Sequence, residues 1–308
     1  MLTRLLIAIA SICLLLFIST QSFAQPDSSS NELEKLLEDD FSKTPKREFI
    51  NNAFKSSRVI NGHSMEMIGN GVLDFRILHR FGQINGGFRE LFGLDQASMR
   101  FGFDFGLTKN VTIGLGRSTF NKEVDGFVKY RIIHQHKKYK PIPFSLVWVS
   151  GMTMNTTKIT DPALNLFKNR LGYYHQMIIG RKFGEAFTLQ LSPTFVHRNL
   201  VALKTDKNDL LAVGLGARVK LTNRSAFILD AFPIAYGARS NYNQWPVSIG
   251  FDIETGGHVF QLHVSNTRGM NEKAFIGETT QRLAKGEIQI GFNLSRVFTV
   301  KRNVDTSW

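Results

Sequence analysis

An alternation of apolar and polar residues with a period of two constrains this chain more than any other feature. It begins at Val72 and continues almost to the C-terminus. Residues 97–106 read ASMRFGFDFG, with methionine and phenylalanine at odd positions and arginine, glycine and aspartate among the even ones. Successive side chains of a β-strand point to opposite faces, so the pattern predicts strands that are apolar on one face and polar on the other.

Two architectures fit such strands. A soluble sandwich buries the apolar face, whereas a membrane barrel turns it outward into lipid. Segments near ten residues long, alternating short and long connections, and aromatic residues near the segment ends favour the barrel. We therefore expect an all-β, antiparallel, transmembrane outer-membrane β-barrel of about twelve strands over residues 72–300. A soluble periplasmic β-protein is a further alternative.

The N-terminus has the pattern of a secretory signal. An apolar run at residues 5–18 follows a basic residue, and small residues precede Gln25. This predicts a signal peptide over residues 1–24, cleaved between Ala24 and Gln25. The single cysteine, Cys13, lies within it, so we expect no thiol chemistry in the mature chain.

A polar stretch separates the signal from the alternating region. Ser29 and Glu32 have the spacing of a capping box and are followed by leucines at helical intervals. Further on, Asn-Gly at positions 61–62 indicates a turn. We expect residues 25–71 to form a short, partly helical leader that is periplasmic or enters the lumen, and residues 301–308 to form a polar tail.

Several short runs resemble a family of exported β-barrel proteins of unknown function found in Bacteroidota. They are HRFG at 79–82, FGLDQASMRFGFDFG at 92–106, GLGRS at 114–118, DGFVKYRI at 125–132 and, before the barrel, FKSSRVINGHSME at 54–66. The likeness covers roughly residues 53–295. It implies a barrel in an outer membrane and brings no activity, catalytic residue or cofactor with it.

Charged residues recur on the polar face of the alternating segments, so we expect them to line the lumen. They are Arg76, Arg80, Arg100, Asp104, Lys129, Arg131, Arg218, Asp230, Asp252, Glu254 and Glu287. They form either a selectivity ladder for a polar or anionic solute or a network of paired charges that fills a narrow barrel. The formal charge of +13 favours anionic neighbours such as lipid head groups and lipopolysaccharide.

One run resembles the active site of an enzyme. His263-Val264-Ser265-Asn266 is similar to the His-x-Ser-Asn run of outer-membrane phospholipase A, whose His and Ser act as base and nucleophile. Val264 belongs to the apolar face, so His263 and Ser265 are expected to point into the lumen, away from lipid. Thr267 also stands where that family has a glycine. We therefore expect no enzyme, with a lipid-acting barrel as the alternative.

Together these patterns predict a barrel in the cell outer membrane of a Gram-negative bacterium. It is expected to be a passive or gated pore for small polar or anionic solutes, or a structural or binding barrel. Outer-membrane lipids and lipopolysaccharide are its expected neighbours. No catalytic residue, cofactor, metal site or nucleic-acid partner is predicted.

Overall fold

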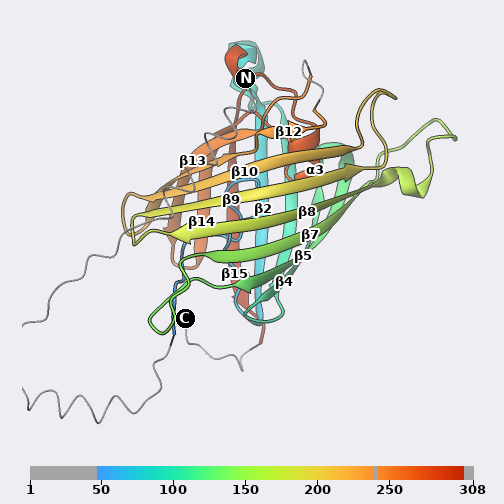
Figure 1. Ribbon diagram of the computed structural model, residues 1–308. Helices are drawn as coiled ribbons and strands as arrows, with labels where there is room; N and C mark the ends of the chain where they lie inside the picture. The colour runs from blue at the N-terminus through green and yellow to red at the C-terminus, as the bar shows by residue number, and fades with distance from the viewer. Residues whose placement is uncertain (1–46, 239–241, 302–308) are drawn as a thin grey trace, which may run out of the picture. The chain divides into compact units, whose positions relative to one another are not determined.

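A closed β-barrel makes up most of the computed structural model, which describes residues 47–238 and 242–301 (Figure 1). The strand order is β11-β13-β14-β15-β2-β3-β4-β5-β7-β8-β9-β10, and β10 pairs back with β11, so these twelve strands close into a barrel. Every neighbouring pair is antiparallel. The prediction of an all-β antiparallel barrel of about twelve strands is confirmed.

The barrel strands are β2 (Val72–Gln83), β3 (Ala97–Gly106), β4 (Val111–Ser118), β5 (Glu123–Ile133), β7 (Ser145–Asn155), β8 (Leu171–Lys182), β9 (Phe187–Arg198), β10 (Asp209–Lys220), β11 (Ser225–Ala231), β13 (Val247–Thr255), β14 (His258–Ser265) and β15 (Gln289–Thr299). The smaller elements are β1 (Glu48–Phe49), β6 (His136–Lys137), β12 (Ile234–Tyr236), η1 (Ile84–Gly93), η2 (Phe120–Lys122), η3 (Phe167–Arg170), α3 (Glu272–Gly277) and η4 (Leu283–Lys285). β11 and β12 both pair with β10: β11 pairs with its C-terminal half and β12 with Leu211 and Ala212 near its start.

The strands are apolar outside and polar inside. In β3, Phe101 and Phe103 are 40% and 52% exposed, whereas Arg100 and Asp104 are fully buried. A soluble sandwich buries its phenylalanines, so this burial pattern is the reverse of one. A closed barrel can present such a face to hydrocarbon because every wall strand pairs with two neighbours, leaving no backbone edge open.

The two ends of the barrel differ. Short connections at residues 107–110, 183–186, 221–224 and 256–257 define the short-turn end, and long ones such as 84–96, 156–170 and 266–288 define the long-loop end. The connection between β5 and β7 is longer than the other turns at its end because it carries β6, which pairs with β1. Val72 pairs with Thr299, so β2 begins and β15 finishes at the short-turn end.

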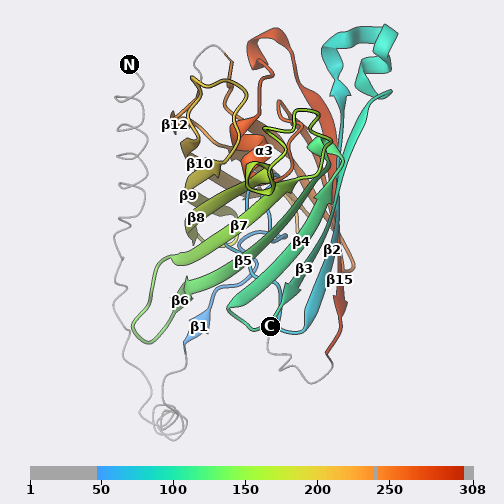
Figure 2. The same cartoon turned by 90° about the vertical axis from the view of Figure 1, so that its right-hand side faces the viewer.

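Two segments fill the interior of the barrel. The first, residues 53–66, is called here the lumen hairpin: Val59 N–H donates to Gly62 O at 2.9 Å and Ser64 N–H donates to Ser57 O at 3.0 Å. It is the blue segment that follows β1 and lies among the strands in Figure 2. The second, residues 267–279, is the lumen loop, and every residue of its helix α3 is buried.

Parts of the sequence prediction fall outside this description. The signal peptide, its cleavage point at Ala24 and Gln25, and the helix expected after Ser29 lie in residues 1–46, and most of the predicted tail lies in 302–308. Within the described ranges, no helix has both the length and the apolar character to cross a membrane.

Candidate functional site

The inner wall of the barrel carries most of the predicted lumen residues. Eight of the eleven are at most 4% exposed and belong to the wall strands: Arg76, Arg80, Arg100, Asp104, Lys129, Arg218, Asp230 and Asp252. Glu123, Asp125 and Lys182 occupy inward positions too and were not singled out from the sequence. The period of two would have found them, since each alternates with an outward neighbour.

The other three predicted residues lie elsewhere. Arg131 is half-buried at the short-turn end of β5, and Glu254, near the end of β13, pairs with Lys55 at 2.5 Å. The prediction that Glu287 lines the lumen from a strand is wrong, because β15 begins only at Gln289. Glu287 precedes that strand and pairs with Arg282 at 3.4 Å, so the alternating pattern extends beyond the strand itself.

The charges of the buried wall balance. Among the described wall residues, six buried cations face six buried anions. Arg100 grips Asp125 through two bonds, Nε to Oδ1 at 2.8 Å and Nη2 to Oδ2 at 2.5 Å, and Arg76 lies 3.6 Å from Asp74. Two-pronged guanidinium–carboxylate pairs are strong and directional. The described wall therefore carries buried charges of both signs, and Arg100–Asp125 and Arg76–Asp74 are direct ion pairs among them.

Asp230 holds the tip of the lumen hairpin. Its Oδ2 accepts hydrogen bonds from three successive backbone N–H groups, of Ile60 at 3.2 Å, Asn61 at 2.7 Å and Gly62 at 3.0 Å. A Cβ on Gly62 would lie 2.5 Å from the ring of Phe232, so glycine is required where the tip meets the wall.

Other wall side chains hold the tip from β2, β13, β14 and β15. Asn61 donates to Ser248 Oγ at 2.8 Å and accepts from Arg80 Nη2 at 2.8 Å. The carbonyl of Val59 accepts from Gln261 at 2.7 Å, and that of Ile60 accepts from Asn293 at 3.0 Å. The tip is thus bound by hydrogen bonds on almost every backbone group that faces these strands.

The two arms of the hairpin are held by side chains of β2, β3 and β5. Arg76 Nη1 donates to Ser57 Oγ at 2.5 Å, and that hydroxyl lies 3.2 Å from Asp104 Oδ2, to which it donates. Lys129 Nζ donates to the carbonyls of Ser57 at 3.2 Å and Glu66 at 2.5 Å, one on each arm. One wall lysine therefore ties the two arms together.

The lumen hairpin and the lumen loop meet in the interior. Arg58 Nη1 lies 3.0 Å from Glu272 Oε1, and both side chains are fully buried. Glu272 Oε1 is also 3.5 Å from His63 Nε2. Burial, reinforced by the charge of Arg58, lowers the pKa of His63 well below its ordinary value, so the imidazole is neutral at pH 7.

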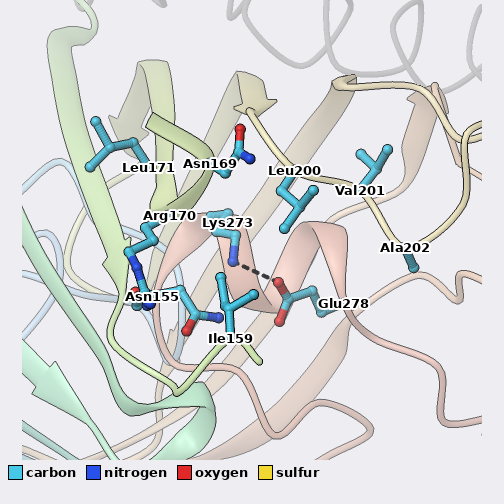
Figure 3. Close-up of a pocket in the computed structure, with 10 residues that line it drawn as sticks. All are labelled: Asn155, Ile159, Asn169, Arg170, Leu171, Leu200, Val201, Ala202, Lys273 and Glu278. Atoms are coloured by element: carbon cyan, nitrogen blue, oxygen red, sulfur yellow. Dashed lines mark hydrogen bonds and ion pairs between the residues drawn. The ribbon is translucent and has the colours of Figure 1, made fainter. Parts of the chain in front are cut away.

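The lumen loop is bound to the wall near the long-loop end. Lys273 Nζ lies 2.5 Å from Glu123 Oε1 and 2.7 Å from Glu278 Oε1, the second contact being the dashed line in Figure 3. Asn271 donates to Glu123 Oε2 at 2.7 Å and caps α3 by accepting from Ala274 N–H at 2.9 Å. Lys273 and Glu278 line a pocket of about 190 Å³ together with Arg170 and Leu200.

One side of the lumen is apolar, which the sequence reading missed. Inward residues of β7 to β10 form a cluster with the hairpin and α3: Val147, Val149, Ile178, Val196, Leu210, Phe54, Val59, Met65, Phe275 and Ile276. The available signal was the run LVWV in β7, where apolar residues occupy both faces. A strand that is apolar on both faces is buried on both, here by lipid outside and by the hairpin inside.

His263 and Ser265 lie inside the barrel, at 2% and 1% exposure. Ser265 Oγ is 2.7 Å from Ser248 Oγ. A different Ser–His pair lies on the outer face, where Ser150 Oγ is 2.9 Å from His175 Nδ1. In residues 47–238 and 242–301, no group of three His, Cys, Asp or Glu side chains is arranged to hold a metal ion.

A closed antiparallel sheet with apolar side chains outside and charged side chains inside is a membrane β-barrel. The chain belongs to the family described as membrane bound beta barrel domain (DUF5777), which matches residues 54–298. The match therefore includes the lumen hairpin as well as the wall.

The chain is similar in fold to several solved outer-membrane barrels, at low sequence identity. They include the COG4313 outer membrane channel from Pseudomonas putida F1 (12% identity, TM-score 0.45, 76% of this chain and 97% of that one). Two others are LpxR from Salmonella typhimurium (9%, 0.33, 74% and 99%) and the toluene transporter TbuX from Ralstonia pickettii (9%, 0.33, 78% and 96%). No curated protein matches the chain.

Proposed function

We propose that the protein is a gated channel of the outer membrane, closed by the lumen hairpin in the state described here. The observation that carries this proposal is the chemistry of the hairpin's grip. On the side of β2, β11, β14 and β15, the hairpin is held by side chains that water can also solvate, such as Asp230, Gln261 and Asn293. Its withdrawal would leave a hydrated, polar wall, as an aqueous passage requires.

The proposed cargo is a small polar or anionic solute. Withdrawal of the hairpin frees the cations Arg76, Arg80 and Lys129, which now contact it, along with the anions Asp104 and Asp230. The hairpin also pairs with Glu272 through Arg58 and with Glu254 through Lys55, so its withdrawal frees charges of both signs. The short-turn end, where β2 begins, is placed in the periplasm because exported barrels have short turns there.

Conductance in planar bilayers tests the proposal. The mature chain lacking residues 25–68 keeps every wall strand, and it is expected to give steady current steps where the intact chain is silent. The matched control is a variant in which a disulfide joins the hairpin to the wall. Asn61→Cys with Ser248→Cys replaces two residues whose side chains are 2.8 Å apart. Oxidation of this pair should hold the channel shut under any condition that opens the intact protein.

The outcome that would overturn gating is equally defined. If the shortened barrel folds, as judged by heat-modifiable migration on a gel, and still carries no current, the lumen is closed by the wall and lumen loop themselves. The protein would then be a structural or binding barrel.

A lipid-acting enzyme is the second candidate, and the outward-facing pair of Ser150 and His175 is the observation that favours it. A hydroxyl within reach of an imidazole is what a serine nucleophile needs. Incubation with phospholipid vesicles is expected to give no hydrolysis. Hydrolysis that is lost in Ser150→Ala, but retained in Ser265→Ala, would establish the enzyme instead.

A further inference from the structure

The outer wall of the barrel is hollowed at one place. A groove of about 450 Å³ opens on the outside of β7 to β10 and β12. Its lining includes Trp148, His175, Met177, Phe195, Leu211 and Ala235. These side chains are on the outward face of the strands, within the same apolar surface as the exposed phenylalanines of β3.

The backbone explains why the wall is recessed here. Pro193 lies within β9 and has no N–H to give to a ladder. The pairing of β8 with β9 passes from Gln176↔Thr194 to Ile179↔Leu191, omitting the pairs between them. Beside it, Val213 N–H donates to Pro233 O at 3.0 Å, and the register of β10 with β12 shifts between Leu211 and Ala212. The ladders on both sides of this region are thus interrupted, and the small Ala235 is among the residues that line the groove.

We propose that this groove binds one acyl chain of a membrane lipid. The groove lies on the membrane-facing side, so hydrocarbon is the medium that fills it. Its volume falls in the ~300–1,000 Å³ range of ligand pockets, which are mostly apolar with few polar groups. The histidine that lines the groove already has partners. His175 Nδ1 contacts Ser150, and the His175 ring stacks on Trp148 with centroids 6.3 Å apart.

A chain in the groove gains over a chain on the flat wall. The groove is open to the outside, and its lining of Trp148, Met177, Phe195 and Leu211 offers an occupant more contact than a flat wall does. Each extra carbon contact adds a small dispersion energy, and many contacts together hold a chain in place. The site should therefore saturate at a low mole fraction of lipid, independently of whether the barrel conducts.

Fluorescence quenching tests this binding, because Trp148 is a reporter within the groove. The chain has three tryptophans, so Trp245→Phe with Trp308→Phe leaves Trp148 alone. The protein is reconstituted in phosphatidylcholine vesicles, and a phosphatidylcholine brominated on its acyl chain is added in steps. Quenching is expected to rise steeply and saturate at low mole fraction.

Two further variants decide the result. Ala235→Phe fills the groove and should abolish the saturable part, leaving only the gradual quenching of a lipid-facing tryptophan. Ala217 also faces outward, on β10, but lies away from the groove. Ala217→Phe should therefore retain the saturable part of the quenching. Gradual quenching of equal size in all three proteins would overturn the proposal. Heat-modifiable migration verifies that each variant has folded.

Discussion

Asp230 illustrates how a single residue positions an entire segment. One carboxylate oxygen receives three consecutive backbone N–H groups, so the tip of the lumen hairpin fits it in one orientation. Hydrogen bonds to a charged acceptor are stronger than neutral ones. Alternation predicted that Asp230 faces inward. It could not predict the partner, because Ile60 is separated from Asp230 by 170 residues and backbone N–H groups carry no sequence signal.

Replacing this carboxylate should loosen the tip. Asp230→Asn keeps the size of the side chain and removes its charge, and it is expected to cost about 1.5–3 kcal/mol of hairpin docking, as for a bond to a charged group. The measurement is the rate at which a protease cleaves within residues 53–66 of the reconstituted barrel. Asp209→Asn is the control, because that wall aspartate of β10 pairs with His197 of β9 rather than with the hairpin. Equal cleavage rates in the two variants would contradict this role for Asp230.

At the scale of elements, the hairpin and the lumen loop depend on each other. Arg58 and Glu272 are fully buried, and each is the other's counter-charge. Loss of one partner strands a buried charge, which is costly. The sequence predicted the wall strands well, because their environment imposes a strict period of two. The hairpin and loop have no such period. Asn-Gly at 61–62 indicated a turn, but its place inside the barrel depends on contacts with strands late in the chain.

Acid should weaken this junction through His63. The ring of His63 faces Arg58, Glu272, Tyr174 and Phe127, with further cations nearby on the wall. Its pKa is lowered in the folded state, so the unfolded chain binds more protons once the pH falls below about 6.5. The stabilisation that neutral His63 adds to the free energy of unfolding is complete above that pH. It declines below that pH by up to about 1.4 kcal/mol per pH unit.

The unfolding temperature in vesicles, measured from pH 7.5 to pH 5.5, reports this effect. His63→Gln cannot be protonated, so its unfolding temperature should fall less on acidification than that of the intact chain. Burial raises the pKa of Glu66, and protonation of that carboxyl stabilises the fold on acidification, in the opposite sense. Both proteins share this contribution, so the difference between them isolates His63. Parallel pH curves would contradict the assignment.

At the scale of the whole molecule, apolar residues face outward and charges of both signs lie inside. The six buried cations of the described wall balance its six buried anions, so the formal charge of +13 must arise from residues outside this network. Composition alone gave the sign of that charge but not its location. The apolar side of the lumen was equally out of reach, because an inward valine and an outward valine look the same in a sequence.

A barrel of this kind should need detergent for extraction. The unboiled protein should migrate differently from the boiled protein on a gel containing dodecyl sulfate, because the closed ladder resists the detergent until heated. The measurement compares the boiled and unboiled samples of the purified protein. A chain that stayed monomeric in plain buffer without detergent would be incompatible with an exposed apolar surface of this extent.

The docking of the hairpin also marks the end of assembly. Asn61 contacts Ser248 across 187 residues, and Ile60 contacts Asn293 across 233. The hairpin precedes every wall strand in the sequence, and the strands that bind its tip include the last three of the wall, β13 to β15. The full set of hydrogen bonds at the tip therefore forms only when β13 to β15 are in place and the barrel is closed. A chain cut short before β13 would keep the contacts that Asp230, Arg76 and Lys129 make with the hairpin, but it would lose those of Ser248, Gln261 and Asn293.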